Sequence, residues 1–405
     1  MATYIPEKIK EFNKGRIPEI LDLKYKAMRQ DRYRFLRAVP FLFYEDAQKF
    51  SFLHDSPNVW LCGDLHLENL GSYKGDNRIA YFDINDFDEC LLGPCLLDVA
   101  RMLTSIHVAS ANLNITRQQA NNLCEIFTDK YFDMLAEGYI RDLEKQTTRG
   151  AIRQFLRKVQ KRKRKSFLKK KTVTKNNRTN ILIDHTHTLS LKNGEKRIIG
   201  EGIHSWAKKT GASDFFRVKD IAFRIAGTSS LGIRRFVALV NGRGAPNGRF
   251  LIDLKETTPP CAENFIRVAQ PRWINDAERI VEVQKRILSV PPALLAPIEI
   301  GGVHYVLKEM QPAADRIDYT IFHGNQKKLK NVLENMGAIC AWSCLRSSGR
   351  QGSAIADELI SFAEKERSVI KEIRNFAHNY TIALEGYYLD YCRAYDKGYY
   401  TKGKR

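Results

Sequence analysis

The stretch Cys62-Gly-Asp-Leu-His-Leu-Glu-Asn-Leu-Gly71 decides how the chain is interpreted. It places Asp64 and Asn69 five residues apart on a polar loop that follows a predicted strand, 59–62. In phosphoryl transfer, a carboxylate accepts the proton of the attacking hydroxyl, and an amide oxygen can hold Mg²⁺ without adding charge. We therefore expect Asp64 to be a catalytic base and Asn69 to be a ligand of Mg²⁺.

A second acidic motif, Tyr81-Phe-Asp-Ile-Asn-Asp-Phe-Asp-Glu89, follows within twenty residues. The order Asp-x4-Asn, strand, Asp-Phe is that of a protein-kinase catalytic loop and its Asp-Phe-Gly metal loop, although Asp88 stands in the place of the glycine. Asp86 is the preferred second ligand of Mg²⁺. Asp83 is a competing candidate that could instead order the loop at the end of a strand.

The residues after this motif support the choice of Asp86. From Asp86, the chain runs through Gly93-Pro94 to Asp98-Val-Ala100, which resembles the pattern of aminoglycoside and choline kinases. In that pattern the last aspartate braces the catalytic loop, so Asp98 is interpreted as a brace. His66 is expected to form hydrogen bonds within the loop, with contact to phosphate or substrate as the alternative.

A two-metal phosphoesterase is a rival hypothesis, because Gly-Asp-x-His also opens a motif of that class. Such enzymes need further Asp and His clusters, including an Asn-His pair. The sequence has no Asn-His pair, and only His185 and His187 lie close together.

A candidate phosphate-binding loop, Ala226-Gly-Thr-Ser-Ser-Leu-Gly232, lies much later in the chain, between two predicted strands. Gly227 and Gly232 would let the backbone approach a phosphate closely. The amide and hydroxyl groups between them, including those of Ser229 and Ser230, could donate hydrogen bonds to it.

Lys255 follows on the next predicted strand, where it alternates with apolar residues. A predicted helix then carries Glu278 and Glu282, and we prefer Glu282 as the partner of Lys255 because Ile280 and Val283 flank it. This order matches the glycine loop, lysine strand and glutamate helix of a kinase. The segment 308–312 is expected to be a hinge that contacts adenine.

These motifs occur in permuted order, with the catalytic and metal loops first and the nucleotide-gripping lobe later. We expect an α+β fold with two lobes, similar to the protein-kinase fold but circularly permuted. The expected parts are a helical catalytic part (1–150), a basic insertion or linker (151–200), a nucleotide-binding sheet lobe (201–312) and C-terminal helices that pack on the catalytic lobe (313–405).

The predicted elements follow from the periodicity of apolar residues. They comprise helices within 1–50, strands at 59–62 and 78–83, two helices within 95–146, strands at 217–226, 234–241 and 249–256, a helix at 273–289, strands at 296–300 and 303–309, and helices after 325.

Over nearly its whole length, the sequence resembles the bacterial family called domain of unknown function 2252. The motifs that carry the resemblance are Phe35-Leu-Arg37, Cys62–Asn69, Phe82–Glu89, Gly227–Gly232, Leu254–Glu256, Arg279-x-Val-Glu-x-Gln284 and Cys340-x-Trp342. The resemblance implies a distant protein-kinase-like fold, with roles for ATP and Mg²⁺ at the matching positions.

The sequence departs from the family pattern at two places, and the role of Arg37 is a separate question. The glycine loop lacks the middle glycine expected from the family, and Ser348 stands where the family usually has histidine. Arg37 is expected to be a surface arginine, with a contact near the site as the alternative.

The chain has 405 residues and a formal net charge of +20, which favours polyanionic partners. The segment 153–178 holds 13 Lys and Arg and no acid, which predicts a solvated helix face and hinge, with salt-sensitive contact with a polyanion as the alternative. The sequence has no apolar run long enough to span a bilayer and no apolar signal core, and its eight cysteines form no CxxC pair. These features predict a cytoplasmic protein with reduced thiols.

The sequence thus predicts an ATP- and Mg²⁺-dependent phosphotransferase whose phosphoacceptor no motif identifies. The alternatives are nucleotidyl transfer, a pseudokinase that binds a nucleotide without catalysis, and a basic nucleic-acid-binding protein.

Overall fold

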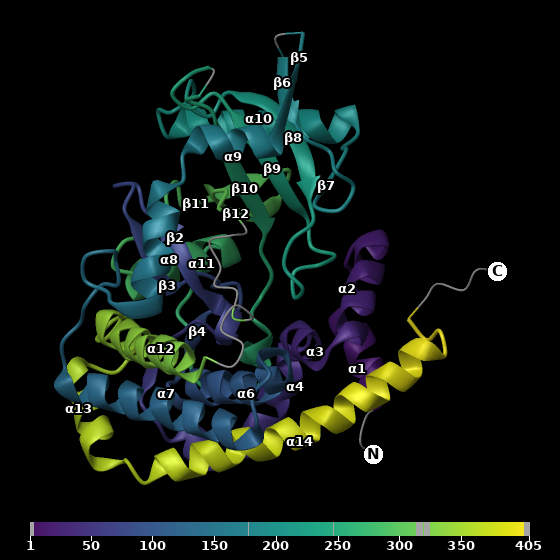
Figure 1. The fold of residues 1–405 in the computed structure, drawn as a ribbon. Coiled ribbons are helices and arrows are strands. Elements are labelled where there is room, and N and C mark those ends of the chain that lie inside the picture. The colour runs from purple at the N-terminus through teal and green to yellow at the C-terminus, as the bar shows by residue number, and fades with distance from the viewer. Residues whose placement is uncertain (1–3, 177, 246, 313–318, 320–324, 401–405) are drawn as a thin grey trace.

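The computed structural model describes residues 4–176, 178–245, 247–312, 319 and 325–400. One lobe is built on a β-sheet and the other is mostly helical (Figure 1). The helices are α1 (Ile5–Phe12), α2 (Pro18–Gln30), α3 (Arg32–Ala38), α4 (Pro40–Ala47), α5 (Ser51–His54), α6 (Leu96–Leu113), α7 (Arg117–Glu137), α8 (Gly150–Lys161), α9 (Arg164–Lys171), α10 (Asn193–Lys209), α11 (Asp276–Ile287), α12 (Gln326–Arg346), α13 (Ala356–Lys365) and α14 (Val369–Asp396), with short 3-10 turns at Leu67–Asn69 and Cys261–Asn264. The strands are β1 (Asn58–Leu61), β2 (Leu70–Lys74), β3 (Ala80–Ile84), β4 (Leu91–Pro94), β5 (Thr172–Lys175), β6 (Arg178–Ile181), β7 (Thr188–Leu189), β8 (Val218–Arg224), β9 (Arg235–Val240), β10 (Phe250–Glu256), β11 (Ala296–Ile300) and β12 (Val303–Glu309).

The sheet lobe contains an antiparallel sheet in the order β11-β12-β10-β9-β8-β7. Side chains alternate between the two faces of each strand. On β10, Ile252 and Leu254 join the apolar cluster that α10 covers, so Leu251, Asp253 and Lys255 lie on the opposite face. That opposite face is turned toward the helical lobe, and it presents charged groups there.

The α+β class is confirmed, and the strands predicted at 217–309 are found with small shifts at their ends. The polar stretch around 172–196 contains secondary structure that was not predicted. It forms the β5–β6 hairpin, the edge strand β7 and the start of α10, and the expected boundary at residue 200 falls inside α10. Short polar strands such as these carry a weak periodicity signal.

The helical lobe packs α7 against α12 and α13, and α6 against the long C-terminal α14, which runs along its outer side (Figure 1). Thr116 caps α7 through a capping box with Gln119. Two short strands were not predicted: β4 pairs with β1, and β2 pairs with β3. These two pairs fix both ends of the loop that carries Asp64.

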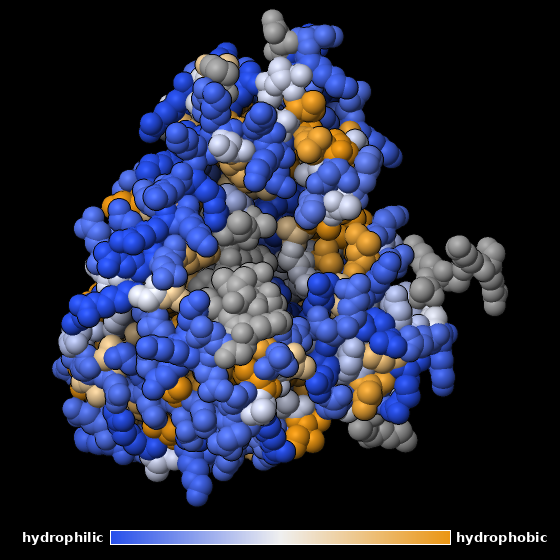
Figure 2. Space-filling view, in the orientation of Figure 1, coloured by the Kyte–Doolittle hydropathy of each residue, from blue (hydrophilic) through white to orange (hydrophobic). Residues whose placement is uncertain are grey.

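The basic segment forms α8 and α9, which connect the two lobes. Leu156 of α8 is buried in the helical lobe, whereas Leu168 of α9 packs beneath the sheet. Gln160 also accepts a hydrogen bond from the backbone of Ala80 over 3.0 Å. The remaining side chains give this side of the molecule a hydrophilic surface (Figure 2). The segment therefore has a structural role, whatever it binds.

The eight cysteines are all buried and free. Within the described residues, no helix combines the length and the apolar character needed to cross a membrane.

Candidate functional site

A cavity of about 310 Å³ lies between the two lobes. Its walls bring together candidates from distant parts of the sequence: Asp64 and Asp86 from the helical lobe, and Gly227, Ser229, Ser230 and Lys255 from the sheet lobe. Its volume is at the lower end of the range for small-molecule sites. Asn69, Gly232 and Glu282 are not among its lining residues.

The loop that carries Asp64 is held by the first turn of α6. The Asp98 carboxylate accepts hydrogen bonds from the backbone N–H of Cys62 over 2.8 Å and of Gly63 over 3.1 Å, which confirms its predicted role as a brace. Gly63 has φ +87°, and a Cβ there would lie 1.8 Å from the carbonyl oxygen of Glu89. Only glycine fits this position.

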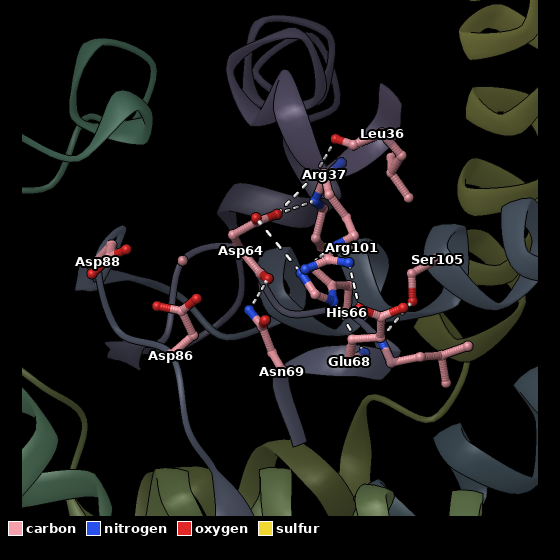
Figure 3. Close-up of polar contacts among 12 residues, drawn as sticks. Leu36, Arg37, Asp64, His66, Glu68, Asn69, Asp86, Asp88, Arg101 and Ser105 are labelled. Atoms are coloured by element: carbon pink, nitrogen blue, oxygen red, sulfur yellow. Dashed lines mark hydrogen bonds and ion pairs between the residues drawn. The ribbon is translucent and has the colours of Figure 1, made fainter. Parts of the chain in front are cut away.

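Asp64 is bound by an arginine that the sequence analysis did not identify. Arg101 donates from Nε over 2.9 Å and from Nη2 over 2.8 Å to Oδ1 of Asp64, and Nη2 also donates to the carbonyl of Leu36 (Figure 3). Burial raises the pKa of Asp64 to about 7, and Arg101 partly opposes this. A signal was present, because Arg101 lies three residues after Asp98 on α6 and so shares its helical face.

Asn69 lies behind Asp64 and outside the cavity lining. Its Nδ2 donates to the backbone carbonyl of Asp64 over 2.6 Å, so its side-chain carbonyl oxygen takes no part in this bond (Figure 3). The Asp86 side chain is 42% exposed and lines the cavity. One carboxylate and one amide oxygen suit Mg²⁺, which usually binds few protein ligands together with phosphates and water. No group of three or more His, Cys, Asp or Glu suited to a metal occurs in the described part of the chain.

His66 and Arg37 form a buried group beside Asp64. Arg37 Nε lies 3.1 Å from His66 Nε2, and Arg37 also forms an ion pair with Glu68. The backbone N–H of Glu68 donates to His66 Nδ1 over 3.1 Å, so His66 does form the expected hydrogen bonds within the loop. Arg37 is only 9% exposed and lines the cavity. The expectation of a surface arginine is therefore wrong, and the alternative of a contact near the site holds.

Lys255 is paired with the acidic motif of the helical lobe. It forms an ion pair with Asp88, and its Nζ lies 3.8 Å from Oδ1 of Asp86. Burial and the neighbouring Asp86 raise the pKa of Asp88, and Lys255 opposes this. Asp88, which stands in the place of the expected glycine, thus connects the two lobes through Lys255.

The structure does not bring Glu282 to Lys255. Glu282 is 39% exposed and pairs with Lys285 over 2.9 Å on the outer side of α11. Ile280 and Gln284 are the α11 residues that line the cavity. Spacing could have shown this, because a buried face that contains 280, 283 and 287 also contains 284 but excludes 282. Gln284 is 1% exposed, and no hydrogen bond to its Nε2 is found within the described residues.

The glycine loop divides into two parts. Gly227, Ser229 and Ser230 face the cavity, and Gly227 has φ +79°, a conformation that favours glycine. Gly232 instead packs on the N-terminal segment, where its carbonyl accepts a hydrogen bond from Ile17 N over 2.8 Å. The Arg16 guanidinium donates to the carbonyl of Ser229 over 2.6 Å, so residues before α2 hold the loop in place.

Two further candidates lie outside the cavity lining. Asp83 forms a buried ion pair with Arg346 of α12 over 3.1 Å, which favours the alternative of an ordering role at the end of its strand over that of a metal ligand. Ser348 donates to the carbonyl of Leu345 over 2.8 Å just beyond the end of α12.

Several charged lining residues were missed by the sequence analysis. Arg224, Arg235, Asp253 and Lys308 come from four different strands of the sheet. On a strand, charged residues that alternate with apolar ones usually face solvent, so only the placement of the helical lobe shows that they line a cavity. Met310, Gln311 and Pro312 also line it, at the position predicted for a hinge.

The fold and the site together define a mixed α+β protein with a charged cavity between a sheet lobe and a helical lobe. The family model described as "Uncharacterized protein conserved in bacteria (DUF2252)" matches residues 16–394. The chain therefore belongs to this family. No curated protein and no solved structure matches it.

Proposed function

We propose that this protein is an ATP- and Mg²⁺-dependent transferase of kinase-like fold that acts at a phosphorus atom of the nucleotide. One observation carries the proposal. A single cavity contains a buried carboxylate (Asp64), a half-exposed carboxylate (Asp86), a glycine-containing loop and a lysine (Lys255), which lie up to about 190 residues apart in the sequence.

The order of elements in the sheet lobe supports the kinase-like part of the proposal. Strand β8, the glycine loop, β9, the lysine strand β10, helix α11 and the strands β11 and β12 follow one another as the corresponding parts of a kinase do. The Asp64 loop precedes them in the sequence but faces them in space. Chain order does not affect the chemistry, because only the positions of the groups around the substrate matter.

The residues have distinct proposed roles. Oδ1 of Asp64 is held by Arg101, so Oδ2 is the oxygen that accepts the proton of an acceptor hydroxyl. Its pKa of about 7 lies near the pH at which a general base is most effective. Asn69 and Asp86 would hold Mg²⁺, which would neutralise charge on the phosphates when bound. Lys255 would exchange its carboxylate partners for phosphate oxygens.

The test is a thermal-shift measurement with ATP and Mg²⁺ on the wild type and on Asp86→Ala. Ligand at millimolar concentration and a micromolar Kd would stabilise the fold by about 4 kcal/mol. We expect a Mg²⁺-dependent shift in the wild type that Asp86→Ala removes. The matched control is Asp390→Ala, because Asp390 is an exposed carboxylate on α14 that pairs with Arg393; it should retain the full shift. The absence of a shift with ATP, GTP, CTP and UTP would refute the proposal.

A further inference from the structure

Four charged side chains form the roof of the cavity, and we call Arg224, Arg235, Asp253 and Lys308 the roof cluster. Asp253 lies at its centre, two residues before Lys255 on β10 and opposite Lys308 on β12. Its Oδ2 lies 2.7 Å from Nη1 of Arg224, and Arg235 donates to its two oxygens over 3.0 and 2.5 Å. The cluster therefore contains three cations and one anion.

The roof cluster is largely removed from solvent. The side chains of Arg224, Arg235 and Asp253 are 16%, 12% and 3% exposed. Burial lowers the pKa of Lys308, and the nearby Asp86 and Asp253 oppose this lowering. Excess positive charge in a desolvated position is costly unless an anion neutralises it.

A further donor lines the same cavity. The side chain of Gln284 is buried, and its Nε2 has no hydrogen-bond partner among the residues that the structure describes. A buried amide N–H without a partner loses its hydrogen bonds to water and gains nothing in return. An acceptor oxygen on a ligand would satisfy it.

The charged side chains of the roof cluster are a poor environment for a purine ring. Arg224 ends the strand before the glycine loop, Arg235 begins the strand after it, and Lys308 is the first residue of the predicted hinge. This is the region where the sequence analysis expected adenine. Sites for flat rings are lined mainly by apolar side chains. Arginine and lysine side chains instead suit phosphate oxygens, which they bind through charge-assisted hydrogen bonds.

We propose that a nucleoside triphosphate binds with its β- and γ-phosphates under the roof cluster and its α-phosphate beside Lys255 and Asp86. This inference rests on the proposed function and specifies its reaction as nucleotidyl transfer. The oxygen of an acceptor hydroxyl bonds to the α-phosphorus, and the bond from that phosphorus to the oxygen bridging to the β-phosphate breaks. Pyrophosphate leaves with the bonding electrons, and the hydroxyl proton passes to Asp64.

In this orientation the nucleoside lies toward the outer side of the glycine loop. A second hollow of about 420 Å³ adjoins the cavity there and shares Arg37, His187 and residues 225–228 with it. Tyr33, Ile225 and Leu231 line this hollow together with charged side chains, among them Asp31, Arg34 and Glu68. A nucleoside there would find both apolar contacts and hydrogen-bond partners for its base and ribose.

The experiment measures binding and product identity separately. Binding of tripolyphosphate, ATP and adenosine, each with Mg²⁺, is measured by calorimetry on the wild type, Lys308→Met, Arg224→Gln and Arg224→Lys. Lys219→Met is the control, because Lys219 is an exposed lysine on β8. Slow hydrolysis of ATP, with water in place of the acceptor, then shows which phosphorus is attacked.

We expect tripolyphosphate to bind the wild type and Lys219→Met alike. Lys308→Met and Arg224→Gln should weaken both tripolyphosphate and ATP at least tenfold, and Arg224→Lys should restore much of the loss. The hydrolysis products should be AMP and pyrophosphate. ATP binding that both variants leave unchanged would show that the roof cluster is only an internal ion-pair network, and ADP with phosphate as products would show the opposite orientation. Either result overturns the inference but leaves the proposed function standing. Failure of the wild type to bind ATP or tripolyphosphate would refute both.

Discussion

The Asp64 loop and the sheet face around Lys255 form opposite walls of one cavity, but different kinds of contact hold them. The loop is fixed through backbone groups: Asp98 accepts two N–H bonds, Asn69 donates to a carbonyl, and Arg101 joins Asp64 to a third segment. Around Lys255, by contrast, side chains pair with other side chains. The Asp64 loop is therefore positioned before any ligand binds. The sheet face holds its charges in pairs that a ligand can replace.

The largest expected effect comes from the loop side. Arg101→Ala would leave Asp64 as a buried carboxylate without its cation, and it would also remove the donor to Leu36. Breaking a buried pair from one side costs about 3–5 kcal/mol. We expect a loss of this size in the free energy of unfolding, measured with urea at pH 8, where the Asp64 carboxylate is ionised.

Two variants test whether the loss of stability arises from the buried pair of Arg101 and Asp64. Arg393→Ala removes an exposed partner of Asp390 and should cost less than about 1 kcal/mol. Arg101→Lys keeps the charge but not the two-pronged contact, so it should fall between the wild type and Arg101→Ala. If Arg101→Ala cost no more than Arg393→Ala, the Asp64 loop would not be held as described.

On the sheet side, we expect a substitution to change the affinity for ligand and not the free energy of unfolding. Lys255→Met removes a cation that would bind phosphate oxygens, and a hydrogen bond to a charged group contributes about 1.5–3 kcal/mol. Calorimetry with ATP and Mg²⁺ should therefore show an affinity roughly 10- to 100-fold lower. The free energy of unfolding without ligand should change little, because Asp86 and Asp88 are less buried than Asp64 and remain near Lys308. An unchanged affinity would show that Lys255 does not contribute to binding of the nucleotide.

Two carboxylates, one on each side, should respond to pH in opposite directions. Burial raises the pKa of Asp64 above its unfolded value, so its contribution to stability is present at low pH and is lost as the pH rises toward about 7. Burial would also raise the pKa of Asp253, but Arg224 and Arg235 lower it overall. Its contribution is therefore present above about pH 4 and is lost as the pH falls below that.

Urea unfolding of the wild type, Asp64→Asn and Asp253→Asn between pH 3 and 8 measures this contrast. Relative to the wild type, Asp64→Asn should gain stability as the pH rises from 4 to 7, by up to about 1.4 kcal/mol per pH unit. Asp253→Asn should show a constant deficit above pH 5 that shrinks toward pH 3. Parallel profiles for the two variants would contradict the described difference between the two sides.

Local patterns were sufficient to predict much of this molecule. Alternating apolar residues and glycine turns gave the strands from 217 to 309, and the spacing of Asp64, Asn69 and Asp86 selected two residues that the structure brings into the cavity and one, Asn69, directly behind Asp64. The contacts that the sequence did not predict join residues that are far apart in the chain. Arg101 reaches Asp64 across 37 positions, and Gly232 rests on an N-terminal segment more than 200 positions away. The spacing of Arg101 from Asp98 indicates which helical face Arg101 shares, but no local pattern encodes the residue that it contacts, because such pairs depend on how distant elements pack.

The smallest expected effect concerns the residue on which prediction and structure differ most. If Glu282 oriented Lys255, Glu282→Gln would lower the affinity for ATP about as much as Lys255→Met does. The structure places Glu282 in an exposed pair with Lys285, and exposed pairs of this kind contribute about 0–1 kcal/mol. We therefore expect less than a twofold change in affinity and less than about 0.5 kcal/mol in stability. Gln284→Leu, two positions further along α11 on its buried face, should instead weaken ATP binding without destabilising the fold, since it replaces an amide whose Nε2 has no hydrogen-bond partner among the described residues with an apolar side chain. A large loss for Glu282→Gln together with none for Gln284→Leu would mean that α11 rotates when the nucleotide binds.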